Sequence, residues 1–111
     1  MENKEGLIWY NGNLIDWKDA KLHVLTHGLH YASSVFEGER SYSGRIFKLH
    51  EHTERLFFSA SQLDFEIPYT IEEIKEACYL TLEKNNLVDA YIRPIAWRGA
   101  ETVGVSAQST K

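Results

Sequence analysis

The segment Val35–Tyr42 constrains the fold more than any other part of the chain. In an extended strand, alternate residues face opposite sides. One side would carry Val35, Glu37, Glu39 and Ser41, and the other Phe36, Gly38, Arg40 and Tyr42. The second side combines an aromatic ring, a gap that lets a ligand approach the backbone, a fixed positive charge and a phenol. We therefore expect a strand with one face suited to a small, partly apolar anionic ligand.

Turn residues predict two hairpins around this strand. Asn11-Gly12 separates Leu7–Tyr10 from Asn13–Asp16, and an Asn-Gly pair between apolar runs is a strong hairpin signal. Ser43-Gly44 similarly separates the strand from a returning segment at Arg45–Phe47. We expect antiparallel pairing in both places.

Apolar residues at helical spacing predict two long helices. One runs from about Leu49 to Leu63 and ends before Pro68. The other begins at the capping-box pattern Thr70–Glu73 and ends near Asn85-Asn86, where Asn tolerates a left-handed conformation. A further single helical turn is expected just before the central strand, at residues 27–31.

The last third of the chain predicts one more strand, at Ala90–Trp97, rich in β-forming residues. Pro94 inside it lacks an N–H, so we expect an edge position or a bulge there. From residue 100 to 111 the residues are small and polar, and we expect a tail. The expected fold class is α/β (α+β two-layer): a mixed, largely antiparallel sheet with N-terminal hairpins and two covering helices.

Composition excludes several classes of protein. The net charge is −4, from 16 acidic and 12 basic residues, with no basic cluster, so nucleic-acid binding is not expected. The chain has no apolar run long enough to span a bilayer, so no membrane partner is expected. A single cysteine, Cys78, favours a reducing compartment, and we expect a cytoplasmic protein. His50 and His52 are two residues apart on a predicted helix and do not face each other. His27 and His30 could share a face but have neither Cys nor carboxylate at ligand spacing, so no metal site is predicted.

Three motifs resemble the branched-chain amino-acid aminotransferases, which are pyridoxal-phosphate (PLP) enzymes of class IV, fold type IV. The motif H-x-L-H-Y-(G/A)-x-x-V-F-E-G-x-R-x-Y stands at His27, Leu29, His30, Tyr31, Ala32, Val35, Phe36, Glu37, Gly38, Arg40 and Tyr42. E-H-x-x-R-L follows at Glu51, His52, Arg55 and Leu56, and Y-I-R-P stands at Tyr91–Pro94. The resemblance spans essentially the whole chain and implies the N-terminal small domain of such an enzyme.

The resemblance implies that Arg55 binds the cofactor phosphate, a role that suits a planar, permanently charged guanidinium. From helical geometry alone, Arg55 lies on the flank of its helix with the guanidinium in water. The resemblance also implies that Tyr91 contacts the substrate's α-carboxylate and that Arg93 receives the side-chain carboxylate of glutamate. We expect Arg55 and Arg93 to border one shared cleft.

Further substrate-binding residues are implied by the same resemblance. These are Tyr31, donated across a dimer interface, Phe36 and Gly38 as pocket lining, Arg40 as a nearby charge, and Val105 as a residue that closes the pocket of the partner subunit. Without the motifs, the aromatic residues would be core residues and Gly38 a bulge glycine. Expected partners are amino-acid and 2-oxo-acid substrates and a second copy of the chain in a homodimer or higher homo-oligomer.

The family's Schiff-base lysine has no counterpart among the seven lysines of the sequence, so no catalytic residue is assigned. We expect residues 1–99 to form the small domain, residues 100–111 to begin the interdomain segment, and the large lysine-bearing domain to be absent. Such a chain would neither hold PLP alone nor transaminate. The alternatives are a sister activity, D-amino-acid transamination or aminodeoxychorismate lysis, and a non-catalytic dimerising module.

Overall fold

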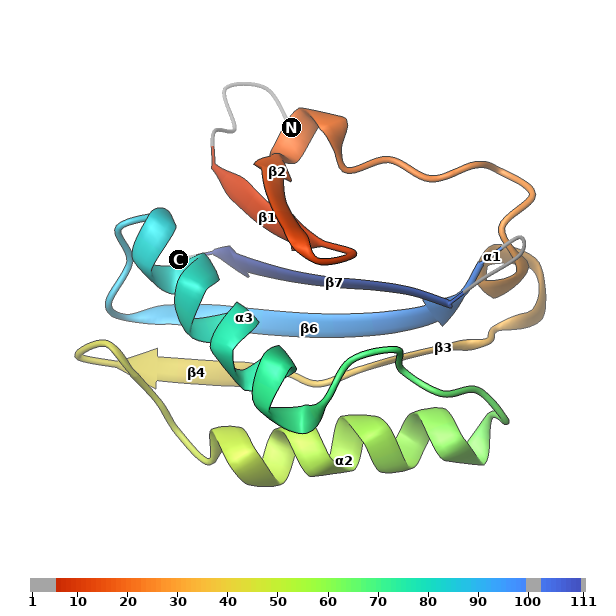
Figure 1. Cartoon of the computed structure of the whole chain (residues 1–111). Coiled ribbons are helices and arrows are strands. Elements are labelled where there is room, and N and C mark those ends of the chain that lie inside the picture. The colour runs from red at the N-terminus through yellow and green to blue at the C-terminus, as the bar shows by residue number, and fades with distance from the viewer. Residues whose placement is uncertain (1–5, 100–102, 111) are drawn as a thin grey trace.

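A computed structural model describes residues 6–99 and 103–110 of the chain. It consists of an antiparallel sheet and two long helices that pack on one face of it (Figure 1). The strands are β1 Leu7–Tyr10, β2 Asn13–Asp16, β3 Ser34–Phe36, β4 Glu39–Tyr42, β5 Arg45–Ile46, β6 Ala90–Arg98 and β7 Val103–Thr110. The helices are the 3-10 turn η1 Trp17–Asp19, α1 His27–Tyr31, α2 Leu49–Gln62 and α3 Ile71–Lys84. The predicted fold class is confirmed.

Both predicted hairpins are present. β1 pairs with β2 so that Tyr10 faces Asn13, across a turn with positive φ at Asn11 and Gly12. β4 pairs with β5 across Ser43 and Gly44, which also have positive φ. Two successive positive φ angles match the twist of the flanking strands, so the turn residues set these registers.

The central strand β6 pairs with β7 on one side and with β3 and β4 on the other. Phe36 faces Ile95 and Glu39 faces Ile92, so β3 and β4 keep one register and no residue is inserted between them. At the break, the Glu37 N–H donates to the Pro94 carbonyl at 3.1 Å, but proline has no N–H to donate in return. The edge position or bulge predicted for Pro94 is therefore wrong: the neighbouring strand is interrupted instead.

The tail predicted after Gly99 is also wrong for residues 103–110, which form β7 between β6 and β1. β7 pairs with β6 along its whole length and with β1 near Trp9. Its small residues fit their neighbours: the Trp97 ring lies against Gly104 and leaves no room for a Cβ. The composition of residues 100–111 indicated a tail. In the structure, residues 103–110 form a strand because they pair with the edges of β1 and β6.

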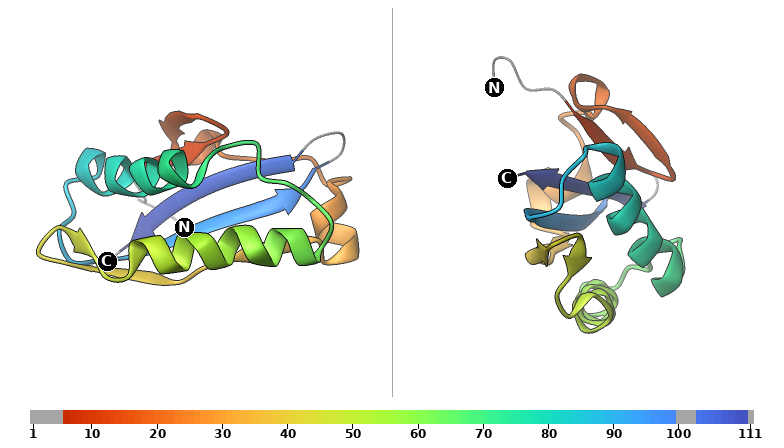
Figure 2. Two further views of the ribbon diagram at one scale, coloured as in Figure 1. Left: turned by 60° about the horizontal axis from the view of Figure 1, so that its bottom comes forward. Right: turned by 90° about the vertical axis from the view of Figure 1, so that its left-hand side faces the viewer.

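α2 and α3 lie side by side over one face of the sheet (Figure 2). Leu56 and Ile74 from these helices pack with Ala96 and Val105 of the sheet, and a second cluster surrounds Cys78. The predicted capping box is confirmed, because the Thr70 hydroxyl accepts from the Glu73 N–H and Glu73 accepts from the Thr70 N–H. No helix in residues 6–99 and 103–110 is long and apolar enough to cross a membrane.

The alternation predicted for the central strand is confirmed. Val35, Glu37, Glu39 and Ser41 are buried or half-buried, whereas Phe36, Gly38, Arg40 and Tyr42 are exposed. The first set faces the helices, and the second faces away from them. We call the side of the sheet opposite the two long helices the open face.

Candidate functional site

Four of the predicted site residues come together on the open face, where β6 passes the break between β3 and β4. The Arg93 guanidinium carbon lies 4.2 Å from the centre of the Phe36 ring. The Arg93 Nε donates to the Tyr91 hydroxyl at 3.0 Å. A Cβ on Gly38 would lie 2.9 Å from that hydroxyl, so only glycine lets Tyr91 fold over the strand. Arg40 is exposed and faces Tyr91 across the ladder.

This open-face cluster combines a cation with an apolar surface. The aromatic ring of Phe36 holds the guanidinium through a cation–π contact, worth about 0.5–1 kcal/mol at an exposed site. Tyr91 occupies the Nε edge of Arg93, so the Nη groups can still donate to an anion. The arrangement can therefore accept either an apolar chain against Phe36 or a carboxylate at Arg93.

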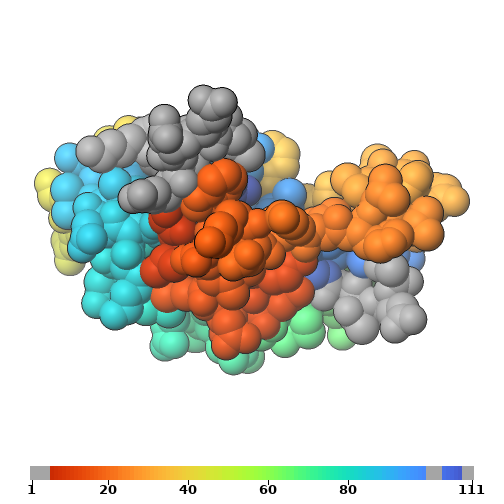
Figure 3. Space-filling view, turned by 90° about the horizontal axis from the view of Figure 1, so that it is seen from above, coloured from red at the N-terminus to blue at the C-terminus, as the bar shows by residue number. Residues whose placement is uncertain are grey.

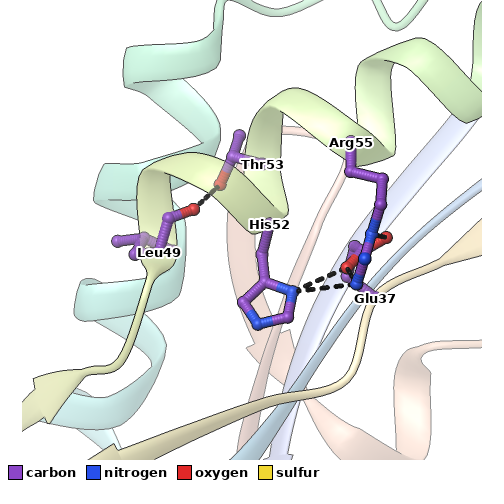
Figure 4. A network of polar contacts seen from close by, with 5 residues as sticks. All are labelled: Glu37, Leu49, His52, Thr53 and Arg55. Atoms are coloured by element: carbon purple, nitrogen blue, oxygen red, sulfur yellow. Dashed lines mark hydrogen bonds and ion pairs between the residues drawn. The ribbon is translucent and has the colours of Figure 1, made fainter.

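A second group of polar residues lies on the helix side of the same strand. Glu37, at the break after β3, is 6% exposed and reaches toward α2 (Figure 4). Its carboxylate accepts from Arg55 Nε at 2.9 Å and from Arg55 Nη2 at 2.7 Å. His52, one turn earlier on α2, lies with Nδ1 2.7 Å from Glu37 Oε1. We call Glu37, His52 and Arg55 the Glu37 network.

The contacts within the Glu37 network favour the charged forms of Glu37 and Arg55. Burial alone would raise the pKa of Glu37, but the hydrogen bonds and charges of Arg55 and His52 outweigh it, and the pKa falls below its ordinary 4.5. The carboxylate in turn raises the pKa of Arg55. The Arg55 side chain is 65% exposed and two of its five N–H donors bond to Glu37, so it can still bind an anion from solvent.

The contacts of Arg55 and Arg93 lie on different sides of the sheet, and the shared cleft expected between them stays a prediction. Arg55 belongs to the helix side and bonds to Glu37, whereas Arg93 belongs to the open face and contacts Phe36 and Tyr91. The two groups of contacts are joined through the consecutive residues Glu37 and Gly38. In this chain they form two half-sites on either side of one strand.

Val105 lies elsewhere than predicted. It is 1% exposed and packs in the core beneath α2 and α3, opposite Ala96 in the sheet. The period of two in β7 turns Val105 to the helix side and Gly104 to the open face. A core residue presents no side-chain surface to a partner's pocket, so the predicted place of Val105 is corrected to the core.

Tyr31 ends α1 and is 71% exposed, with its ring 4.6 Å from that of His27. The part of the chain that includes α1, drawn in orange, projects from the body of the molecule (Figure 3). We call residues 24–31 the projecting lobe. Within residues 24–31, Val24, Leu25 and Leu29 are exposed apolar residues, and Leu22 precedes them.

Sequence reasoning missed three residues of the site region. Glu37 and His52 stood inside the F-E-G and E-H-x-x-R-L motifs but received no role. Glu39 is 1% exposed, and neither of its carboxylate oxygens has a hydrogen-bond partner within the described residues. Burial, together with the nearby charge of Glu37, raises the pKa of Glu39 to about 8. Strand alternation could have identified Glu39 as buried, because it places Glu39 on the same face as Val35 and Ser41.

Another hollow lies beside α3, away from all these residues. It is lined by Trp9, Gly12, Tyr69, Glu73, Glu76, Ala77, Tyr79, Leu80 and Glu83. Across the part of the chain that the structure describes, no three His, Cys, Asp or Glu side chains are grouped so that they could hold a metal ion.

Comparison with known proteins agrees with the motifs. The family described as amino-transferase class IV matches residues 34–111. A probable branched-chain-amino-acid aminotransferase of Rickettsia bellii is 53% identical over 104 residues, covering 94% of this chain and 36% of the relative. The branched-chain-amino-acid aminotransferase of Pseudomonas aeruginosa is 47% identical and matched over 100% of this chain and 38% of its own length.

Solved structures show the same architecture. The T.th. branched-chain amino acid aminotransferase complexed with N-(5'-phosphopyridoxyl)-L-glutamate superposes with a TM-score of 0.93 at 39% identity, covering 97% of this chain and 41% of that chain. The Escherichia coli branched-chain amino acid aminotransferase superposes with a TM-score of 0.90 at 39% identity, covering 96% of this chain and 40% of that chain. This chain spans little more than a third of the length of its curated relatives, and it belongs to the class IV amino-transferase family.

Proposed function

We propose that this chain is the small domain of a branched-chain amino-acid aminotransferase. The whole enzyme moves the amino group of Leu, Ile or Val to 2-oxoglutarate with the help of PLP. The observation that carries the proposal is the open-face cluster, in which Arg93 stacks on Phe36 and bonds to Tyr91 over Gly38. The names of relatives at up to 53% identity support the same activity.

The open-face cluster suits two unlike substrates in turn. A branched apolar side chain packs on Phe36, and the Arg93 guanidinium meets the second carboxylate of glutamate or 2-oxoglutarate. Tyr91 donates its hydroxyl hydrogen to the α-carboxylate, and exposed Arg40 adds positive charge beside it. Val105, in the core, has no part in this pocket.

Arg55 is the residue that would hold the PLP phosphate. Its exposed guanidinium and unused N–H donors fit a phosphate group. When bound, PLP supplies an electron sink for the carbon that carries the amino group. One charge-assisted bond contributes about 1.5–3 kcal/mol, whereas association costs about 4–15 kcal/mol. We therefore expect this chain alone to bind PLP no better than about millimolar, and to show no transamination.

A second copy of the chain completes the site in this proposal. The projecting lobe exposes Leu25 and Leu29 beside Tyr31, and exposed apolar residues that gather on one lobe favour association. Tyr31 would then line the pocket of the other copy. Light scattering over a range of concentrations tests this: a chain that stays monomeric contradicts it.

The activity is tested in a chimera in which this chain replaces the matching third of the Pseudomonas aeruginosa relative. We expect transfer from Leu, Ile and Val to 2-oxoglutarate, and none from D-alanine, the substrate that would mark a sister activity. Arg93→Gln should raise KM for 2-oxoglutarate at least tenfold, which is about 1.4 kcal/mol of lost carboxylate binding, with little change for the branched chain. A folded, PLP-loaded chimera without this transfer would contradict the proposal.

A further inference from the structure

We propose that Glu37 and His52 are positioning residues, which hold the Arg55 guanidinium in the orientation that receives an anion. The inference deepens the proposed function and rests on the cofactor role given there to Arg55. It starts from the Glu37 network, in which one buried carboxylate joins two side chains of α2 (Figure 4).

The bonds of Glu37 leave one edge of the guanidinium free. The carboxylate occupies the side edge of Arg55, taking Nε and one hydrogen of Nη2. Both hydrogens of Nη1 and the second hydrogen of Nη2 remain. One hydrogen of each nitrogen lies on the end edge, and the other Nη1 hydrogen points back toward Cδ. Two parallel N–H groups on that edge match two oxygens of a phosphate. Glu37 therefore fixes the plane of the guanidinium without occupying the edge that an anion would use.

The bonding also fixes the hydrogen on His52. Glu37 Oε1 accepts from Arg55 Nη2 at 2.7 Å and lies 2.7 Å from His52 Nδ1. A carboxylate oxygen only accepts, so Nδ1 carries a hydrogen. The 3.4 Å contact between His52 Nδ1 and Arg55 Nη2 then joins two donors and is not a hydrogen bond. His52 therefore acts on Arg55 only through Glu37.

Glu37 is well anchored for this task, and Arg55 is not. Glu37 is 6% exposed, and its N–H bonds to the Pro94 carbonyl. The Arg55 side chain is 65% exposed, and a free arginine side chain loses rotamer entropy when it binds an anion. The carboxylate removes much of that freedom before an anion arrives. Pre-organisation of this kind improves affinity.

The opposite role for Glu37 is competition with the anion for Arg55. A competitor would occupy the end edge and would have to leave, whereas Glu37 lies on the side edge and is buried on the strand. The two roles predict opposite signs: loss of Glu37 weakens anion binding if it positions Arg55 and strengthens it if it competes.

The test uses this 111-residue chain, nitrogen-15 labelled, with inorganic phosphate as the probe. The Arg55 Nε–H resonance reports both the order of the guanidinium and phosphate binding. In Glu37→Gln, we expect the order parameter of Arg55 Nε–H to drop toward that of a free side chain and phosphate binding to weaken about three- to tenfold, as the lost pre-organisation implies.

His52 provides a matched pair of variants. The amide of Asn occupies the place of Nδ1, so His52→Asn keeps a donor for Glu37, whereas the amide of Gln lies farther out, near the place of Nε2. We expect His52→Asn to preserve the Arg55 order and phosphate affinity and His52→Gln to reduce both. His50→Gln is the control on the same helix, because His50 is exposed and pairs with Glu54 at 3.5 Å instead.

The outcomes separate this inference from the proposed function. Unchanged Arg55 order and affinity in both Glu37→Gln and His52→Gln, with native thermal unfolding, overturn the inference alone. Tighter phosphate binding in Glu37→Gln overturns it in favour of competition. A wild-type chain in which phosphate never shifts the Arg55 resonance also overturns the inference alone, because the cofactor role of Arg55 is proposed for the whole enzyme. Failure of the proposed function is instead a folded, PLP-loaded chimera without transfer.

Discussion

Glu37 and Glu39 lie two residues apart, on the same face of one strand, and their carboxylates have opposite fates. Both are buried, at 6% and 1% exposure. Glu37 bonds to Arg55 and His52 and its pKa is lowered, whereas Glu39 has no partner within the described residues and its pKa is raised to about 8. Burial alone therefore does not decide the charge of a carboxylate. The charge also depends on whether hydrogen-bonding or charged side chains lie beside the carboxylate.

The difference arises from what each carboxylate meets beneath the helices. Glu37 lies at the break opposite Pro94 and reaches the charged flank of α2. Glu39 has returned to the ladder opposite Ile92, within the apolar cluster around Cys78. Burial, and secondarily the nearness of Glu39, raises the pKa of the Cys78 thiol. Two residues along one strand thus separate a polar setting from an apolar one.

The largest expected effect is a loss of stability as pH rises, caused by Glu39. In the unfolded chain its pKa is near 4.5, and in the folded chain it is about 8. Between these values the unfolded state has lost the proton and the folded state keeps it, so each pH unit lowers the folding equilibrium constant up to tenfold. Below pH 4.5 Glu39 is protonated in both states and no longer makes the free energy of unfolding depend on pH. Above about pH 8 it is ionised in both states, so the loss of stability levels off. Over the whole window it amounts to several kcal/mol.

Urea unfolding at intervals from about pH 4.5 to about pH 9 measures this effect, with Glu39→Gln as the control. Glutamine keeps the shape and cannot ionise, so its curve should lack the decline. Equal slopes for the wild-type chain and Glu39→Gln would show that Glu39 does not carry the proton.

Replacing Glu39 by methionine should remove the free-energy cost of burying a carboxyl group that has no hydrogen-bond partner. A buried polar group without a hydrogen bond costs about 1–3 kcal/mol, and methionine fills a similar volume without polar atoms. We expect Glu39→Met to raise the free energy of unfolding by about that amount at pH 5, and by more at pH 8. Differential scanning calorimetry at both pH values measures it. A destabilised Glu39→Met variant would point to a bonding partner for the carboxyl.

Sequence alternation was enough to place both glutamates on the helix side. It could not show which of them would meet Arg55, because that depends on how α2 packs across the strand. The hairpins, the helices and the capping box were likewise predictable, since turn residues and helical spacing act locally. β7 and the break opposite Pro94 were not, because each depends on strands distant in sequence.

The candidate site divides in the same way. Phe36, Gly38, Tyr91 and Arg93 converge as expected, because alternation along two paired strands brings them to one face. Alternation could not place Arg55, which bonds to Glu37 on the helix side of the strand. Val105 was misplaced because its segment was expected to be a tail.

Arg55→Met tests whether the neighbours of Glu37 set its charge. Without the guanidinium, Glu37 keeps its burial and only His52 as a partner, so its pKa should move from below 4.5 to above it and come to resemble that of Glu39. The wild-type carboxylate stabilises the fold above pH 4.5, and this contribution is lost as pH falls through its lowered pKa. In the variant that acid decline should disappear.

Carbon-13 NMR of the Glu37 carboxyl follows the titration directly. Arg98→Met is the matched control, since it removes the same charge from a residue that bonds to the Leu63 and Asp64 carbonyls. A Glu37 pKa that stays below 4.5 in Arg55→Met would mean that His52 suffices.

Glu73 completes the comparison as a partnered but exposed carboxylate, and it should have the smallest effect. It accepts from the Thr70 N–H at 2.8 Å at the start of α3, where water can replace it. We expect Glu73→Ala to lower the free energy of unfolding by about 0.5–1 kcal/mol, with Glu76→Ala, farther along the helix, nearly neutral. Urea unfolding of both variants near neutral pH measures this. If Glu73→Ala lowered the free energy of unfolding as much as ionisation of Glu39 does, exposure to water would not explain why Glu37, Glu39 and Glu73 differ in their effect on stability.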